Sequence, residues 1–269
     1  MTWNKFLYAL IGAFTLAFSV TVEAANEMDT SRYRLIAHRG GVVDAESPEN
    51  SLQALEKAIQ AGYWMVEVDL RMTIDSVLIV NHDATFKRYY GVDKRVSDMT
   101  WEEVSELTSD VGTKVLTFEE LLRHCKGNIN LMIDNKIRGN DTVLFHKVIN
   151  LLKQYNLYDQ ALMIGTEEST PFFTGKIKLS CTRKQLEENM KKLGYDPSHY
   201  YLFSGNITKE DVAWAKQHQI LTVGALNAWG MKTTNIMSKA QAQAERLKKA
   251  GVTNYQIDSI FAEFFSHEE

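Results

Sequence analysis

Polar residues stand at the ends of short apolar runs along this chain. Four such runs carry, in order, His38 and Arg39, Glu67 and Asp69, His82 and Asp83, and Asp134 and Lys136. Short apolar runs bounded by turn residues predict buried strands, and strands that alternate with helices predict a parallel sheet. The ligand crevice of such a sheet lies at the carboxyl ends of its strands. We therefore expect these polar side chains to meet in one place.

Strand-like and helix-like segments alternate along most of the chain. Strands are expected at residues 34–38, 64–70, 77–81, 129–134, 160–164, 177–181, 200–203, 220–225 and 254–257. Helices are expected at 51–62, after Thr100, Thr117 and Thr208, and at 141–155, 183–193 and 237–250. Alternation of this kind produces right-handed strand–helix–strand units, and eight of them close a barrel of about 250 residues. The predicted fold is a single-domain α/β protein, a (β/α)₈ barrel of the TIM type.

One pair of predicted strands breaks the alternation. Only Arg71 to Ser76 separates segment 64–70 from segment 77–81. This connection is too short for a crossover helix, so the two segments are expected to form a hairpin. The barrel should therefore carry a short extra strand or hairpin after its second strand, with His82 near the mouth.

The amino-terminal segment has the pattern of an export signal. Lys5 precedes an apolar stretch from Phe6 to Val20, and small residues around Ala24 fit a cleavage site. Residues 1–24 are thus predicted to be a signal peptide and residues 25–269 the barrel domain, exported to the periplasm or secreted. An uncleaved amino-terminal anchor is the alternative. No later segment resembles a transmembrane helix, and we expect no stable membrane insertion of the mature chain.

Charge and cysteine content limit the possible partners. The net charge is −4 and there is no basic stripe, so the sequence does not favour nucleic-acid binding. Cys125 follows a helix-like run, whereas Cys181 ends a strand-like one. A disulfide would require the fold to bring them within bonding geometry. We interpret them as two unpaired or buried thiols.

Glu67 and Asp69 are two residues apart in one strand-like run, so their side chains point to the same side. Two such carboxylates are costly to ionise unless a cation neutralises them. Oxygen ligands suit Ca²⁺ or Mg²⁺ better than zinc. Asp134 precedes Lys136 by the same spacing, which allows three acids to converge on one cation. Alternatively, the acids lie at solvated strand ends and pair with Arg or Lys.

His38 and His82 each end a predicted strand. Cleavage of a phosphodiester needs one group that takes a proton from the attacking hydroxyl and another that donates a proton to the departing alkoxide. Imidazoles can do both near neutral pH. Arg39 can bind phosphate oxygens with its planar fork, and Lys136 can approach them as a point charge. Structural histidines and surface ion pairs are the alternatives, but the whole set favours metal-assisted cleavage of a phosphate ester.

Taken in order, these motifs resemble those of the glycerophosphodiester phosphodiesterase family. The segments that carry the resemblance are His38-Arg39-Gly40, Pro48-Glu49-Asn50-Ser51, Glu67-Val68-Asp69, Val80-Asn81-His82-Asp83 and Asp134-Asn135-Lys136. No single segment is specific, but their combined order and spacing are.

The resemblance implies a (β/α)₈ barrel that hydrolyses small glycerophosphodiesters to glycerol 3-phosphate and an alcohol, with one divalent metal ion, Ca²⁺ or Mg²⁺. In that family the glycerol 2-hydroxyl attacks first, and water then opens the cyclic phosphate. The resemblance makes His38 and His82 the acid/base pair, and it places Glu49 and Asp83 in support of the site. The implied metal ligands are Glu67, Asp69 and Asp134, and the implied phosphate contacts are Arg39 and Lys136.

The chain also departs from the family pattern. Asp134 stands where the family usually has a longer Glu. A family Trp that lies three residues before an Asn is missing before Asn227, and Trp229 either replaces it or serves in ordinary packing. Asp258 matches a family Asp near the last strand, although Ile257 and Ser259 weaken the match. These differences suggest a different alcohol or glycerol pocket.

Two other functions remain open from the sequence. A related barrel phosphodiesterase of the phospholipase type would act on intact lipids and would need an exposed apolar rim. The aromatic residues of segments 172–180 and 261–266 are candidates for such a rim, although buried packing explains them more simply. A barrel that binds a phosphate ligand without cleaving it is the non-catalytic alternative.

Overall fold

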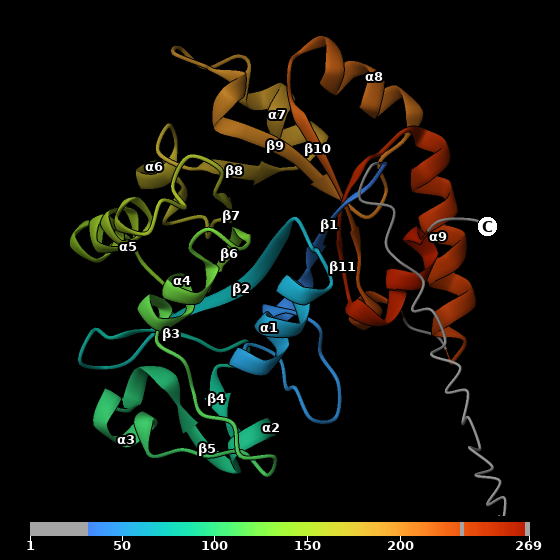
Figure 1. Ribbon diagram of the computed structural model, residues 1–269. Coiled ribbons are helices and arrows are strands. Elements are labelled where there is room, and N and C mark those ends of the chain that lie inside the picture. The colour runs from blue at the N-terminus through green and yellow to red at the C-terminus, as the bar shows by residue number, and fades with distance from the viewer. Residues whose placement is uncertain (1–31, 232–233, 267–269) are drawn as a thin grey trace, which may run out of the picture.

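The computed structural model describes residues 32–231 and 234–266, and the expected signal segment lies outside them. Eight parallel strands form a closed barrel, because β1 pairs with both β2 and β11 (Figure 1). The barrel strands are β1 (Arg34–Ala37), β2 (Met65–Met72), β6 (Asn130–Asn135), β7 (Leu162–Ile164), β8 (Lys178–Cys181), β9 (Tyr200–Ser204), β10 (Leu221–Leu226) and β11 (Asn254–Ile257). The predicted TIM-type barrel is confirmed.

The break in the alternation is a hairpin, as the short connection predicts. Strand β3 (Leu78–Val80) runs antiparallel to the end of β2, and Leu70 is opposite Val80. Because β3 bonds to β2 outside the barrel, it is the expected extra strand. The backbone N–H of Asn81 then donates to the carbonyl oxygen of Asp69 at 2.9 Å, which holds the following His82 at the barrel mouth.

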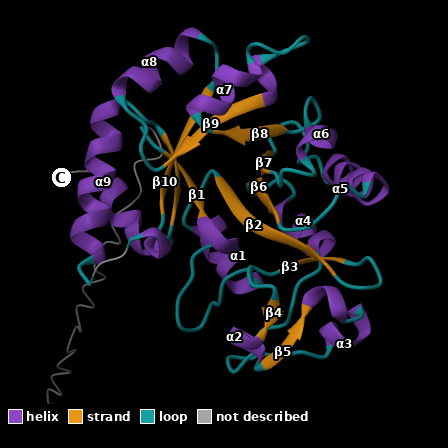
Figure 2. Ribbon diagram, turned by 180° about the vertical axis from the view of Figure 1, so that it is seen from behind, coloured by secondary structure: helices purple, strands orange, loops and turns teal. Residues whose placement is uncertain are grey.

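Helices surround the barrel in both views (Figures 1 and 2). They are α1 (Leu52–Gln60), α4 (Phe118–Cys125), α5 (Thr142–Gln154), α6 (Thr170–Phe173), α7 (Arg183–Asn189), α8 (Lys209–Gln217) and α9 (Ile236–Ala250). The threonines that the sequence singles out begin helices: Thr117 and Thr208 each form a complete capping box. No helix within the described ranges is long and apolar enough to cross a membrane.

The core has two layers. Apolar side chains from six strands fill the barrel interior: Ile36, Met65, Met132, Leu162, Tyr201 and Val223. A larger layer packs between the strands and the helices and includes Phe172, Phe173, Phe261 and Phe265, so these aromatic residues are buried. Cys125 and Cys181 are free and buried, which confirms the interpretation of two unpaired thiols.

A small insertion, residues 84–116, follows β3. It contains β4 (Thr85–Phe86), α2 (Lys87–Tyr90), β5 (Val92–Arg95) and α3 (Trp101–Ser105). Its own apolar cluster includes Phe86, Val96 and Val104, and both views show it beside β2 and β3 rather than in the helical ring. The start of α3 was predicted from Thr100, whereas β4 and β5 were not predicted.

Candidate active site

The structure brings together the three acidic side chains of the predicted metal site. Glu67 and Asp69 project from β2, and Asp134 projects from the adjacent β6, where it lies in register with Asp69. One carboxylate oxygen from each lies within 4.8 Å of the others. Glu67 and Asp69 are each only 1% exposed, so two of the three acids are fully withdrawn from water.

Burial and mutual repulsion dominate the electrostatics of this carboxylate cluster. Burial, together with the carboxylates of Asp69 and Asp134, raises the pKa of Glu67 well above its ordinary value. Burial also raises the pKa of Asp134. Lys136 is the nearby cation: its Nζ lies 2.6 Å from Asp134 Oδ2 and 3.3 Å from Asp69 Oδ1. Burial alone would lower the pKa of Lys136, but these two carboxylates raise it.

The cluster fits a divalent cation. Three acids face one lysine, so ionised side chains leave a net negative charge in a buried place. All the ligand atoms are oxygens, which suits Ca²⁺ or Mg²⁺. Asn50 fixes one ligand, because its Nδ2 donates to Asp69 Oδ2 at 3.0 Å and its Oδ1 accepts from the Asp69 backbone N–H at 3.3 Å. A divalent ion would offset the repulsion that Lys136 leaves uncompensated.

Backbone geometry at the end of β1 presents the next two residues to the cluster. Arg39 adopts the left-handed conformation (φ 55°), and its N–H donates to Glu67 Oε2 at 2.7 Å. Gly41 has φ 142°, and a Cβ built there would lie 2.0 Å from the carbonyl oxygen of Ala54. Only glycine permits α1 to approach this closely. The turn therefore fixes His38 and Arg39 against the acids.

His38 is held by an acid from the far end of the chain. Its Nδ1 lies 2.5 Å from Asp258 Oδ1, and its Nε2 lies 3.8 Å from Glu67 Oε2. The other oxygen of Asp258 accepts from the backbone N–H of Ala228 at 2.6 Å. Burial works against ionisation of Asp258, but the hydrogen bond and charge of His38, together with the Ala228 N–H and the charge of Arg39, lower its pKa below the ordinary value. Asp258 therefore orients His38 so that Nε2 faces the carboxylate cluster.

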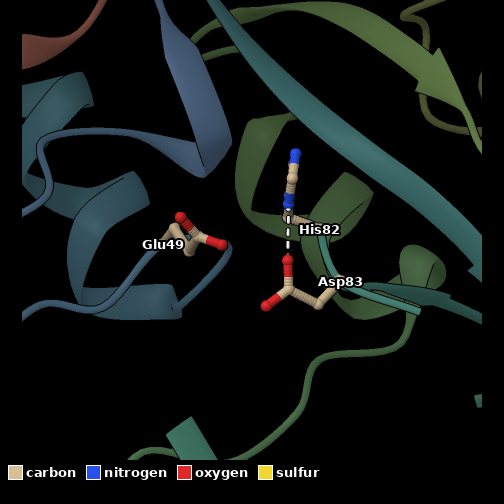
Figure 3. A group of neighbouring side chains, drawn as sticks. All are labelled: Glu49, His82 and Asp83. Atoms are coloured by element: carbon tan, nitrogen blue, oxygen red, sulfur yellow. Dashed lines mark hydrogen bonds and ion pairs between the residues drawn. The ribbon is translucent and has the colours of Figure 1, made fainter. Parts of the chain in front are cut away.

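His82 has a matching acidic partner. Its Nδ1 lies 2.8 Å from Asp83 Oδ1, an interaction drawn in Figure 3. Because Asp83 is ionised, Nδ1 carries the proton, and Nε2 accepts from Arg39 Nη2 at 3.1 Å. Arg71 fixes the backbone here, since its Nη2 donates to the His82 carbonyl oxygen at 2.6 Å.

Ion pairs and hydrogen bonds connect His82 to the insertion. Arg88 of α2 contacts both oxygens of Asp83 and also donates from Nη1 to Glu49 Oε2 at 3.1 Å. Its contact lowers the pKa of Asp83 to about 2. Glu49 in turn accepts from Arg39 Nη1 at 2.9 Å.

Glu49, His82 and Asp83 also lie close enough to hold a metal ion (Figure 3). The guanidinium groups of Arg39 and Arg88 already neutralise this group. The carboxylate cluster is therefore the better candidate for a metal site.

Sequence reasoning underestimated several residues of the site. Ser51 caps α1, whereas Asn50, which the sequence placed only next to that helix, bonds to Asp69. Asp258 appeared as a weak family match, and no sequence signal linked it to His38. Arg88 was not singled out at all. Trp229 is 75% exposed, so its side chain is not part of the core.

The chain also resembles known proteins in sequence. A model described as the glycerophosphoryl diester phosphodiesterase family matches residues 38–252. The human lysophospholipase D GDPD1 is 32% identical over 135 residues, or 45% of this chain and 41% of that protein. Human glycerophosphodiester phosphodiesterase 1 is 33% identical over 132 residues, or 46% of this chain and 38% of that protein. The chain thus matches about two fifths of the length of these relatives.

Solved structures share the fold. A glycerophosphoryl diester phosphodiesterase from Parabacteroides distasonis superposes with a TM-score of 0.69 at 21% identity, over 89% of this chain and 86% of that chain. A phosphodiesterase from Oleispira antarctica, in complex with the product sn-glycerol-3-phosphate, gives a TM-score of 0.64 at 17% identity, over 86% and 96% of the two chains.

The raised pKa of Glu67 predicts a pH-dependent effect on stability without metal. The folded state binds the Glu67 proton more tightly than the unfolded chain does. Its stabilising contribution is therefore present below the ordinary value of 4.5 and is lost as pH rises through the folded pKa. Glu67→Gln removes this titration. In the presence of chelator, the difference in melting temperature between the Glu67→Gln variant and wild type should therefore shift in favour of the variant as pH rises from 4 to 8. Scanning calorimetry measures this difference. A pH-independent difference would show that Glu67 ionises without cost.

Proposed function

Because the chain belongs to the glycerophosphoryl diester phosphodiesterase family of hydrolases, we propose that it hydrolyses glycerophosphodiesters to glycerol 3-phosphate and an alcohol. One observation carries the proposal. Two histidines, each with its Nδ1 held by an aspartate, lie in the same barrel mouth as three clustered carboxylates. This arrangement supplies proton transfer and cation binding together, which a site that only binds a phosphate does not need.

The two histidines act as the acid/base pair. Asp258 and Asp83 fix the Nδ1 protons of His38 and His82, so that Nε2 of each ring is the atom that exchanges protons with substrate. One imidazole takes the proton of the glycerol 2-hydroxyl as that oxygen attacks phosphorus. The other donates a proton to the departing alkoxide. The same two groups exchange roles when water opens the cyclic phosphate.

The carboxylate cluster would hold the divalent ion typical of the family, with Glu67, Asp69 and Asp134 as ligands. Such an ion, Ca²⁺ or Mg²⁺, supplies a positive charge that binds phosphate oxygens and lowers the pKa of a nearby hydroxyl. Lys136 lies against two of these acids, where its ammonium group can also contact the phosphate.

Arg39 is the second phosphate contact that we propose. Its guanidinium reaches Glu49 and the Nε2 of His82, so it lies where a phosphate in contact with that imidazole would lie. Glu49 orients Arg39 and Arg88 together. A substrate phosphate would accept from Arg39 and free the Nε2 of His82 for proton transfer.

Intact lipids are a weaker alternative. A relative at 32% identity is named a lysophospholipase D. However, four of the aromatic residues that the sequence offered for membrane docking, Phe172, Phe173, Phe261 and Phe265, are buried, and the fifth, Phe264, is partly buried against the core. We therefore favour deacylated diesters. The signal-like segment 1–24 supports the further proposal that the protein is exported.

The direct test is an assay of the purified protein against glycerophosphocholine, glycerophosphoethanolamine and lysophosphatidylcholine, with release of glycerol 3-phosphate as the readout. We expect turnover of the deacylated diesters, loss of turnover after exhaustive chelation, and recovery with Ca²⁺ or Mg²⁺. Full activity in the metal-free protein would remove the ion from the mechanism. Turnover of the lysolipid alone would favour the alternative substrate class.

His38→Ala and His82→Ala should each reduce kcat by about two orders of magnitude or more, because each removes a positioned acid or base. His124→Ala on the exposed face of α4 is the matched control and should retain wild-type turnover. The measurement is steady-state kinetics with glycerophosphoethanolamine. A wild-type rate in either barrel-mouth variant would exclude that histidine from proton transfer.

A further inference from the structure

A basic cavity of about 310 Å³ adjoins the carboxylate cluster. Four cationic side chains line it, and none of the described lining residues is acidic. The four cationic side chains are those of Arg71, Arg95, Lys136 and Arg138. Its volume is at the lower end of the range for small-molecule sites. We call it the basic pocket.

The basic pocket shares the side chain of Lys136 with the active site. Lys136 lines it and at the same time contacts Asp134 and Asp69. Arg71 also lines it while holding the His82 carbonyl oxygen. A substrate with its phosphate at the carboxylate cluster would therefore lie one lysine side chain away from this pocket.

Residues of both the barrel and the insertion line the pocket, and these two parts of the chain lie side by side in Figure 1. Arg71 and Met72 come from the end of β2, and Ile137 and Arg138 follow β6, whereas Arg95 ends β5 of the insertion. Cationic side chains from the barrel and from the insertion thus line one cavity. A surface arginine is common by itself, but this convergence concentrates like charge.

The positive charge of the pocket is compensated only in part, because Lys136 pairs with Asp134 and Asp69 but two of the arginines have no acidic partner in the described part of the chain. Among residues 32–231 and 234–266, no carboxylate lies within ion-pair distance of Arg95 or Arg138. Arg138 lies near enough to Arg71 for the two charges to repel. The acids that attract Arg71 are Asp69, Asp83 and Asp134, and each of these already contacts Lys136 or Arg88. An added anion would relieve this repulsion.

We propose that the basic pocket binds a second anionic group, a phosphate monoester or a carboxylate, carried by the alcohol part of the substrate. The inference rests on the proposed function and adds the substrate class. Arg95 and Arg138 present planar guanidinium forks, which match both anions. Met72, Val96 and Ile137 supply apolar surface for the carbon skeleton between that anion and the scissile phosphate. Diesters with cationic or neutral alcohols would leave the arginines unpaired.

Two matched substrate pairs test the proposal. Glycerophosphoserine differs from glycerophosphoethanolamine by a carboxylate, and glycerophosphoinositol 4-phosphate differs from glycerophosphoinositol by a phosphate. We expect kcat/KM to be about tenfold higher for the acidic member of at least one pair, the size of one charge-assisted hydrogen bond. The pair that shows the preference identifies the anion. Equal kcat/KM values within both pairs would overturn the proposal.

Variants locate the preference. The double variant Arg95→Gln/Arg138→Gln should abolish the preference for the acidic substrate and leave turnover of glycerophosphoethanolamine unchanged. Both side chains are exposed and lie outside the acid/base machinery. Arg138→Glu should reverse the preference, so that kcat/KM is higher for glycerophosphoethanolamine than for glycerophosphoserine. The control Lys209→Gln/Lys216→Gln removes two exposed charges from α8, away from the pocket, and should keep the wild-type preference.

The failure of this inference is distinguishable from failure of the proposed function. No turnover of any of the four diesters would contradict the proposed function itself. Turnover of all four with a preference that persists in Arg95→Gln/Arg138→Gln would overturn only the assignment of the basic pocket.

Discussion

The active site is built around an excess of negative charge at the ends of β2 and β6. Glu67, Asp69 and Asp134 lie together in a buried place, and Lys136 offsets only part of their charge. Carboxylates withdrawn from water are tolerated when they are paired, protonated or bound to a cation. The register of the two strands forces this crowding, because Asp69 and Asp134 are direct neighbours. A bound cation would offset this cost.

The rest of the site is arranged around that cluster from distant parts of the chain. Asp258 at the last strand holds His38 at the first, which is possible because the barrel closes between β1 and β11. The insertion acts from the other side. Its Arg88 binds Asp83 and so fixes His82, and its Arg95 forms a wall of the basic pocket. The insertion thus has a positioning role at one histidine and, in our proposal, a role in selecting the alcohol.

Features that depend on local pattern could be predicted from the sequence. Most of the barrel strands are short, mainly apolar runs, and the spacing of Glu67 and Asp69 places both on the same side of β2. Features that depend on tertiary closure could not. Asp258 is 220 residues from His38, and no periodicity connects them. Strand β5 reads Val-Asp-Lys-Arg, mostly polar and exposed, so it carries no apolar alternation from which to predict a strand.

The location of the metal ion is the central claim, and anomalous diffraction from crystals soaked in Mn²⁺ tests it most directly. Mn²⁺ shares the preference of Mg²⁺ for oxygen ligands. The account predicts one strong peak between Glu67, Asp69 and Asp134 in wild-type crystals and no such peak in Asp69→Asn crystals. A peak at Glu49, His82 and Asp83 with the carboxylate cluster empty, or no peak at a saturating concentration, would contradict it.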